Sequence, residues 1–316
     1  PRERTLMAMG IKALGYVVVQ TAQPDQWDHF LTQVAGVMRA PDAADGARLY
    51  RIDERPFRFR IESGSGEKFV AAAYAVDGAA ALDALAAAIS ASGRPVQAGS
   101  SEAAALRGVE RFFSTTDPAG NGLEFYCGDS VAAVPFVSPL GVPAFVTGEM
   151  GMGHAVFAAP NFDECVAFYR DVVGFHETDM PRFFFGGGPD DPGMGFAFLH
   201  ADNGRHHSIA LGESPIPPSG CVHLMLELTN LIEVGKAYDR MKAHGYAESA
   251  SLGQHINDET VGFYVQTPGG FDLEIGCDSL VIDPATWEVT RHKGISIWGH
   301  EWAWQKAMKA QQEAAE

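Results

Sequence analysis

Two stretches of the chain share one spacing and indicate an internal repeat. Residues 262–274 read Gly-Phe-Tyr-Val-Gln-Thr-Pro-Gly-Gly-Phe-Asp-Leu-Glu, and residues 112–124 read Phe-Phe-Ser-Thr-Thr-Asp-Pro-Ala-Gly-Asn-Gly-Leu-Glu. In each stretch a strand-like run leads to a proline and a glycine-containing turn, and a glutamate stands six residues after the proline. The pattern predicts two strands joined by a tight turn, once in each half of the chain.

The segments around these stretches repeat in the same order. In the first half we expect a strand at 15–19, a helix from 24, strands near 47–61, a strand from 69 and an alanine-rich helix at 78–92. In the second half we expect a strand at 153–157, a helix from 161, strands near 181–188 and 194–211, a strand beginning at His223 and a helix at 230–244. A segment at 129–150 that contains three prolines joins the halves.

Composition bounds the class of protein. A chain of 316 residues with 46% hydrophobic residues can form one large domain or two of ordinary size. A net charge of −17 argues against nucleic acid or an anionic membrane surface as a partner. No window approaches 18 continuous apolar residues, so we expect no membrane-spanning helix. The four cysteines have no zinc-site spacing, which favours reduced thiols in a cytoplasmic protein.

Three polar residues stand inside strand-like runs of the second half. They are His154 in the run 151–157, His223 in the run 221–228, and Glu274 at the end of the repeated stretch. Burying such groups without a partner is costly, and one metal ion is a partner that serves all three. A single histidine in a strand is more often a hydrogen-bonded core residue. Two histidines and one carboxylate together are typical of a non-haem iron(II) site with open positions for substrate and O₂.

The repeat also allows the two halves to be compared. Tyr16 stands in the place of His154, an alanine near Ala71 in the place of His223, and Glu124 in the place of Glu274. The first half thus keeps the pattern and lacks two of the three candidate ligands. We expect it to be a structural module without metal, in which Glu124 is an unpaired relic on the surface or at an interface.

The most specific stretch is residues 255–274, His-Ile-Asn-Asp-Glu-Thr-Val-Gly-Phe-Tyr-Val-Gln-Thr-Pro-Gly-Gly-Phe-Asp-Leu-Glu. With the segments Asn-Gly-Arg-His-His-Ser at 203–208 and Ile-Trp-Gly-His at 297–300, it resembles the type I extradiol ring-cleavage dioxygenases of the vicinal oxygen chelate superfamily. The resemblance is greatest to enzymes of the 2,3-dihydroxybiphenyl 1,2-dioxygenase type. It covers nearly the whole chain, although the first half matches more by pattern than by motif.

The resemblance implies an α+β fold in which four βαβββ modules form two incomplete barrels. It implies a degenerate domain without metal at 1–134, a catalytic domain at 135–290 and a C-terminal tail at 291–316. Members of the family are often multimeric, so we expect a homo-oligomer. The tail helix predicted at Trp302–Lys309 would pack on a neighbour or on its own barrel.

The resemblance also implies the reaction. Iron(II), with manganese(II) as the less favoured metal, would be bound by His154, His223 and Glu274. The enzyme would open the ring of a 3-substituted catechol by inserting both atoms of O₂, as in the catabolism of aromatic hydrocarbons.

Further site residues follow from the same resemblance. His207 is the expected acid and base, and its neighbour His206, on the opposite face of a strand, is expected to be structural. His255 and Tyr264 are expected to orient the substrate hydroxyls. Asn257 and Asp258 are expected to contact these site residues and hold them in place. His300 is either a contact of the tail or a group near the site.

Two other functions and the substrate remain open at this level. The fold also serves metal-dependent glyoxalase-like isomerases or thiol transferases, and non-catalytic binding proteins. The set of His207, His255 and Tyr264 argues against the isomerases and transferases. A binding protein would be favoured if the candidate ligands were missing in both halves, and they are missing only in the first. The phenylalanines at 183–185, 196 and 198 line an apolar cavity or simply fill the barrel, and they do not define which catechol is bound.

Overall fold

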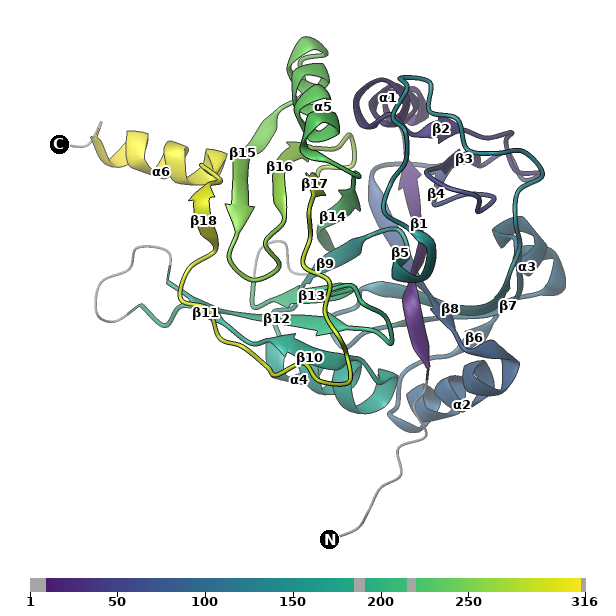
Figure 1. Cartoon of the computed structure of the whole chain (residues 1–316). Helices are drawn as coiled ribbons and strands as arrows, with labels where there is room; N and C mark the ends of the chain where they lie inside the picture. Colours follow the sequence, from purple (N-terminus) through teal and green to yellow (C-terminus); the bar gives the residue numbers. More distant parts are fainter. Residues whose placement is uncertain (1–9, 185–190, 215–219, 314–316) are drawn as a thin grey trace, which may run out of the picture.

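The computed structural model describes residues 10–184, 191–214 and 220–313, which form two curved sheets that stand side by side (Figure 1). The first sheet has the strand order β2-β3-β4-β1-β5-β8-β7-β6. The second has the order β10-β12-β13-β9-β14-β17-β16-β15-β18, with β11 beside β12. None of the helices in these ranges combines the length and apolar character needed to cross a membrane.

The first sheet contains two βαβββ modules. The first module consists of β1 (Ile11–Thr21), α1 (Pro24–His29) with the π-helical turn η1 (Phe30–Ala35), β2 (Met38–Arg39), β3 (Arg48–Arg51) and β4 (Phe59–Ser63). The second consists of β5 (Lys68–Val76), α2 (Gly78–Ala91), β6 (Gln97–Ala98), α3 (Ser101–Arg107), β7 (Val109–Thr116) and β8 (Gly122–Asp129).

The second sheet repeats this plan. Its first module consists of β9 (His154–Ala158), α4 (Phe162–Ala167) with the π-helical turn η3 (Phe168–Val173), β10 (His176–Asp179), β11 (Arg182–Phe183), β12 (Met194–His200) and β13 (Ile209–Gly212). Its second module consists of β14 (Cys221–Glu227), α5 (Leu231–Ala243), β15 (Glu248–His255), β16 (Val261–Gln266) and β17 (Asp272–Cys277). A short 3-10 turn, η2 (Gly148–Met150), precedes β9.

This architecture confirms the predicted α+β fold of four modules in two incomplete barrels. In each half the first strands of the two modules pair antiparallel, β1 with β5 and β9 with β14. The repeated stretches form the hairpins β7–β8 and β16–β17. Their turns close alike, with Gly120 donating to Asp117 and Gly270 to Thr267, and both glycines have positive φ angles, of 92° and 83°.

The two barrels share one hydrophobic core. The ring of Trp27 in α1 packs against Phe271 at 5.7 Å between centroids, and Phe69 in β5 packs against Phe157 in β9 at the same distance. Since these contacts join one half to the other, each barrel supports its neighbour.

Three segments differ from the sequence-based expectation. The strand expected near 194–211 is divided, because residues 201–208 form a loop between β12 and β13. Of the strand expected near 181–188, β11 covers Arg182–Phe183, and residues 185–188 are outside the described part of the chain. Phe185 lies outside the described residues. Helix α3 was not predicted, although Ser100 caps it by accepting from the Ala103 N–H at 3.2 Å.

The C-terminal tail lies on the second barrel of its own chain. Strand β18 (Ser296–Gly299) pairs with β15, and a bridge joins Trp302 to Ala250. Helix α6 (Ala303–Glu313) follows at the edge of the sheet (Figure 1). The tail therefore contacts its own barrel through β18 and Trp302, whereas the described side chains of α6 are exposed, and packing of this helix on a neighbour or on its own barrel stays a prediction.

Candidate metal centre and active site

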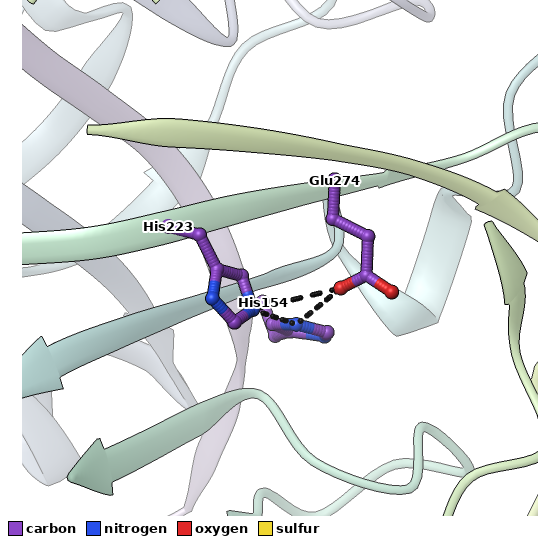
Figure 2. A group of neighbouring side chains, drawn as sticks. All are labelled: His154, His223 and Glu274. Atoms are coloured by element: carbon purple, nitrogen blue, oxygen red, sulfur yellow. Dashed lines mark hydrogen bonds and ion pairs between the residues drawn. The ribbon is translucent and has the colours of Figure 1, made fainter. Parts of the chain in front are cut away.

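The three candidate ligands meet inside the second barrel (Figure 2). The Nε2 atoms of His154 and His223 lie 3.2 Å apart. Glu274 Oε2 lies 3.3 Å from His154 Nε2 and 3.5 Å from His223 Nε2. His154 and Glu274 are buried, and His223 is partly buried and faces the cavity described below.

Strand register explains why residues so distant in sequence converge. Strands β9, β14 and β17 are neighbours, and both His154 and Glu274 pair with Met225 of the central strand. His223 stands two residues before Met225, and residues two apart on a strand point to the same face. All three side chains therefore point into the barrel from one patch of sheet.

Gly153 lets β9 approach β14 closely beside the first ligand. Its φ angle is +129°, and a Cβ atom added there would stand 1.9 Å from the carbonyl oxygen of Met225. A side chain at this position would push His154 away from His223 and Glu274.

Electrostatics keep His223 and Glu274 in the protonation states that a metal ion requires. Burial, opposed by the charge of Glu274, lowers the pKa of His223 to about 3. Burial would raise the pKa of Glu274, yet His154 and His255 hold it well below its usual range. A neutral imidazole and an ionised carboxylate are the states that bind metal ions.

The geometry fits an ion shared by the three side chains. Donor atoms about 2.1 Å from one ion and at right angles to one another lie about 3 Å apart, close to the separations found here. The second carboxylate oxygen of Glu274, Oε1, is buried without a hydrogen-bond partner among the described residues. A buried carboxylate so poorly satisfied by protein donors is explained by a cation that compensates its charge.

A cavity of about 730 Å³ opens over the three donors. Its apolar lining comes largely from β11 and β12, and the tail also lines it. The residues that line it include Phe183, Phe196, Phe198, His207, Asn257, Asp258, Tyr264, Trp302 and Trp304, together with the three candidate ligands and His255. Of the two alternatives for the phenylalanines, lining an apolar cavity is the one observed for Phe183, Phe196 and Phe198, whereas Phe184 is exposed and does not line it. The two tryptophans were not singled out in the sequence.

His255 and Tyr264 form a hydrogen-bonded pair at the cavity wall. The Nε2 atom of His255 lies 2.7 Å from the Tyr264 hydroxyl and 3.5 Å from Glu274 Oε1. Burial alone would lower the pKa of His255, but the carboxylate of Glu274 raises it to about 9. Burial and Glu274 raise the pKa of Tyr264 well above its usual value. Both groups are therefore hydrogen-bond donors at neutral pH.

His300 packs against His255 of this pair and lies outside the main cavity. Its ring lies 4.2 Å from that of His255, its Nδ1 lies 2.7 Å from Ser296 Oγ, and it does not line the main cavity. Burial and the neighbouring His255 lower the pKa of His300 to about 4, so the ring is neutral. Between the two alternatives for this residue, the structure places it near the site, as a neighbour of a cavity residue.

His207 stands beside the metal donors. Its ring lies 3.9 Å from that of His154 and 4.9 Å from that of Phe198, and burial lowers its pKa well below the usual value. Asp258 Oδ2 lies 3.9 Å from His207 Nδ1, and Asp258 Oδ1 accepts from the Thr260 N–H. Of the two residues expected to support the site, Asn257 and Asp258, both line the cavity and Asp258 approaches His207.

The expectation for His206 was wrong in one respect. The two adjacent histidines were expected to point to opposite faces of a strand, but they lie in the loop 201–208 and their Nδ1 atoms are 3.1 Å apart. Only His207 lines the cavity, as expected, because the loop turns His206 toward β10.

The expectation for Glu124 was also wrong. It is buried, and it accepts hydrogen bonds from the Tyr16 hydroxyl at 2.6 Å and from the Arg107 guanidinium at 2.7 Å (Nε) and 2.5 Å (Nη2). The register repeats that of the second half, since Tyr16 and Glu124 both pair with Ala73, two residues after Ala71. A guanidinium from α3 thus provides, in the first barrel, the positive charge that Glu124 needs when buried.

Known proteins match this chain along nearly its whole length. The Glyoxalase/Bleomycin resistance protein/Dioxygenase superfamily matches residues 151–275, and the family described as Dihydroxybiphenyl dioxygenase BphC D1 matches residues 14–64. A biphenyl-2,3-diol 1,2-dioxygenase of Metapseudomonas furukawaii is 38% identical, over 96% of this chain and 97% of the relative. An iron-dependent extradiol dioxygenase of Rhodococcus jostii (strain RHA1) is 33% identical, over 93% of this chain and 98% of the relative.

A solved structure agrees with these matches. The crystal structure of a halotolerant catechol dioxygenase, BphC, superimposes with a TM-score of 0.85 at 31% identity, covering 93% of this chain and 96% of the other. Fold, sequence and the chemistry of the donor set lead to one assignment. The chain belongs to the extradiol catechol dioxygenases of the vicinal oxygen chelate superfamily.

Proposed function

We propose that the enzyme binds one iron(II) at His154, His223 and Glu274 and cleaves a 3-substituted catechol such as 2,3-dihydroxybiphenyl beside its hydroxyl groups. Both atoms of O₂ enter the product. Because the reaction opens the aromatic ring, it belongs to the breakdown of aromatic compounds. The observation that carries this proposal is the set of three donors within 3.5 Å of one another at a large, mostly apolar cavity. Manganese(II) also suits these ligands. The relatives favour iron(II), because one of them is iron-dependent by name.

When bound, iron(II) supplies a centre at which the catechol oxygens and O₂ are brought together and exchange electrons. The protein then has to manage protons. His207 is neutral at physiological pH, lines the cavity and touches the ring of His154, so it is positioned to take a proton from a substrate hydroxyl and to return it later.

His255 and Tyr264 orient the substrate from the other side. Their hydrogen-bonded pair presents donors to the catechol oxygens, and the His255 Nδ1 is 3.2 Å from the Ile295 carbonyl oxygen, which fixes the ring. Asn257 adds a polar group to the cavity, and Asp258 supports His207. The pair thus favours one orientation of the two hydroxyls.

The aromatic side of the cavity accommodates the 3-substituent. Phe183 and Phe196 lie 5.2 Å apart, and the rings of Phe196 and Phe198 are stacked. Aromatic and apolar walls exclude water and bind a second ring by area burial. A catechol with an aromatic or bulky apolar substituent therefore fits this wall better than catechol itself.

The organisation of the chain follows from the same proposal. We propose a metal-free domain at 1–134, a catalytic domain at 135–290 and a tail at 291–316 that closes one side of the cavity. The four cysteines are buried and unpaired, which supports work in a reducing compartment such as the cytoplasm. A homo-oligomer is proposed by analogy with the family.

Purification without oxygen, followed by metal analysis and addition of 2,3-dihydroxybiphenyl in air, tests the function. We expect iron near one per chain and a yellow ring-cleavage product in the visible spectrum. Iron without a yellow product, across a panel of 3-substituted catechols, would refute the proposed reaction while leaving the metal centre. Manganese in place of iron in the active protein would refute the choice of metal.

His207→Gln should slow turnover by about 10²–10⁴-fold, the usual range for a lost general acid or base, with iron content unchanged. Glutamine keeps polar atoms in the buried position, so the fold is expected to persist. The measurement is steady-state kcat with metal analysis of the same sample, and near-normal kcat would reject His207 as the base. His176→Gln, at an exposed histidine paired with Asp202, is the control and should leave kcat unchanged.

A further inference from the structure

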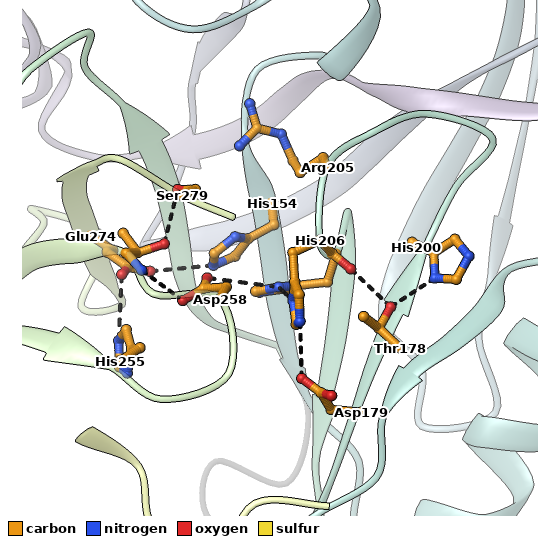
Figure 3. Close-up of polar contacts among 12 residues, drawn as sticks. His154, Thr178, Asp179, His200, Arg205, His206, His255, Asp258, Glu274 and Ser279 are labelled. Carbon is orange, nitrogen blue, oxygen red and sulfur yellow. Dashed lines mark hydrogen bonds and ion pairs between the residues drawn. The ribbon is translucent and has the colours of Figure 1, made fainter. Parts of the chain in front are cut away.

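Behind His207 lies a polar pair that the reaction as described does not use. Asp179 in β10 and His206 in the 201–208 loop are both buried, at 0% and 1% exposure. His206 Nε2 and Asp179 Oδ2 lie 3.0 Å apart and form a buried ion-pair contact (Figure 3). Among the described residues neither atom has another hydrogen-bond partner, so each has only the other to satisfy it.

Strand β10 fixes His206 by backbone as well as by side chain. Thr178, the residue before Asp179, donates its hydroxyl to the carbonyl oxygen of His206 at 2.8 Å. The same hydroxyl lies 2.8 Å from His200 Nδ1, which therefore donates to it. Trp287 packs edge-on against the His206 ring at 5.5 Å. A histidine held at this many points has little freedom to turn.

The other carboxylate oxygen of Asp179 is already engaged. Thr290 Oγ1 donates to Asp179 Oδ1, and Thr290 Oγ1 lies 2.8 Å from His292 Nε2, near the surface. This arrangement leaves Oδ2 as the oxygen that faces His206.

The hydrogen positions along this line are interdependent. A carboxylate accepts only, so the contact directs the His206 Nε2–H at Asp179, and a His206 ring that carries one proton then has a bare Nδ1. His206 Nδ1 is 3.1 Å from His207 Nδ1, and it then accepts a hydrogen bond from His207. The neutral His207 ring carries its proton on Nδ1, so its Nε2 is bare.

We propose that Asp179, acting through His206, is a positioning residue that holds His207 in the tautomer and orientation with a bare Nε2 available to the substrate. The inference rests on the proposed function of His207 and adds two residues to it. Asp179 and His206 touch neither the substrate cavity nor the three metal donors, so their effect reaches the reaction only through His207. Related carboxylate–histidine pairs fix the tautomer of a catalytic imidazole in hydrolases.

Asp179→Asn and His206→Phe, each made in the full-length iron-loaded enzyme, test the proposal. Asparagine can turn its amide N–H toward His206, and phenylalanine keeps the ring shape but has no nitrogen. We expect either variant to lower kcat by about tenfold or more. The loss should not exceed the about 10²–10⁴-fold expected when the acid and base itself is removed. KM for 2,3-dihydroxybiphenyl and the iron content should stay close to those of the unmodified enzyme.

A double-mutant comparison separates positioning from a merely structural effect. In a His207→Gln background, Asp179→Asn should cause no further loss of kcat, because the residue through which it acts is already gone. An equal loss of kcat in both backgrounds would overturn the proposal, as would unchanged kcat in both single variants. Asp202→Asn, which removes the exposed carboxylate of the His176 pair, is the matched control and should change nothing.

Failure of this inference is distinguishable from failure of the proposed function. If His207→Gln slows turnover and Asp179→Asn does not, only the positioning role of Asp179 is refuted. If the His207→Gln variant turns over substrate normally, His207 is refuted as the base, and the positioning role of Asp179 is refuted with it. A fall in kcat accompanied by loss of iron would show that Asp179 maintains the metal centre, and would also overturn the proposal.

Discussion

His223→Ala is expected to yield a folded protein that holds no iron and opens no catechol ring. The side chain provides one of three donors. Of the residues paired with it on β9 and β17, Val156 has no donor atom in its side chain and Asp272 already accepts a hydrogen bond from Ser249 at 2.6 Å. Even losing a group that only supports a metal ligand costs about 10–100-fold in affinity, so losing the ligand costs more. Metal analysis after gel filtration without oxygen, with oxygen uptake on 2,3-dihydroxybiphenyl, measures both effects.

The comparison requires a histidine that should not matter. His244 is exposed at the end of α5, away from the cavity, and His244→Ala should keep iron and activity. Iron near one per chain in His223→Ala would remove this residue from the ligand set. A loss of iron in both variants would indicate a general loss of structure, which circular dichroism would reveal.

The fold and the positions of the candidate ligands could be predicted because both depend on strand periodicity. The repeated stretch sets the register of the last hairpin in each half, and period-two alternation then decides which side chains face inward. The equivalences drawn from sequence alone, Tyr16 with His154 and Ala71 with His223, hold in the register of β1, β5 and β8. A pattern that fixes register therefore also fixes which residues can meet.

What could not be predicted depends on contacts between segments without a pattern. Helix α3 is a short alanine-rich segment at 101–107, and nothing in its spacing indicates that Arg107 reaches a glutamate seventeen residues away. The loop 201–208 looks like a strand because apolar residues stand on both sides of it. Its actual path brings His206 to Asp179, a pairing that only the tertiary structure shows.

Arg107→Met is expected to lower the free energy of unfolding by about 3–5 kcal/mol, the cost of leaving a buried carboxylate without its partner. Arg107 makes two hydrogen bonds to Glu124, and both side chains are largely buried, at 15% and 4% exposure. Methionine fills similar space and removes the charge. Urea unfolding followed by fluorescence measures the change, with the slope checked for an intermediate because the chain has two barrels.

A charge-free version of the same cluster tells whether the loss comes from an unpaired charge or from poor packing. Adding Glu124→Leu and Tyr16→Phe to Arg107→Met removes every polar group of the cluster, and should recover most of the lost stability. Iron content near one per chain should persist in the folded fraction of all three proteins, because the metal donors lie in the other barrel. If Arg107→Met unfolds within about 1 kcal/mol of the unmodified protein, as a surface ion pair would, the guanidinium is not the group that allows Glu124 to be buried.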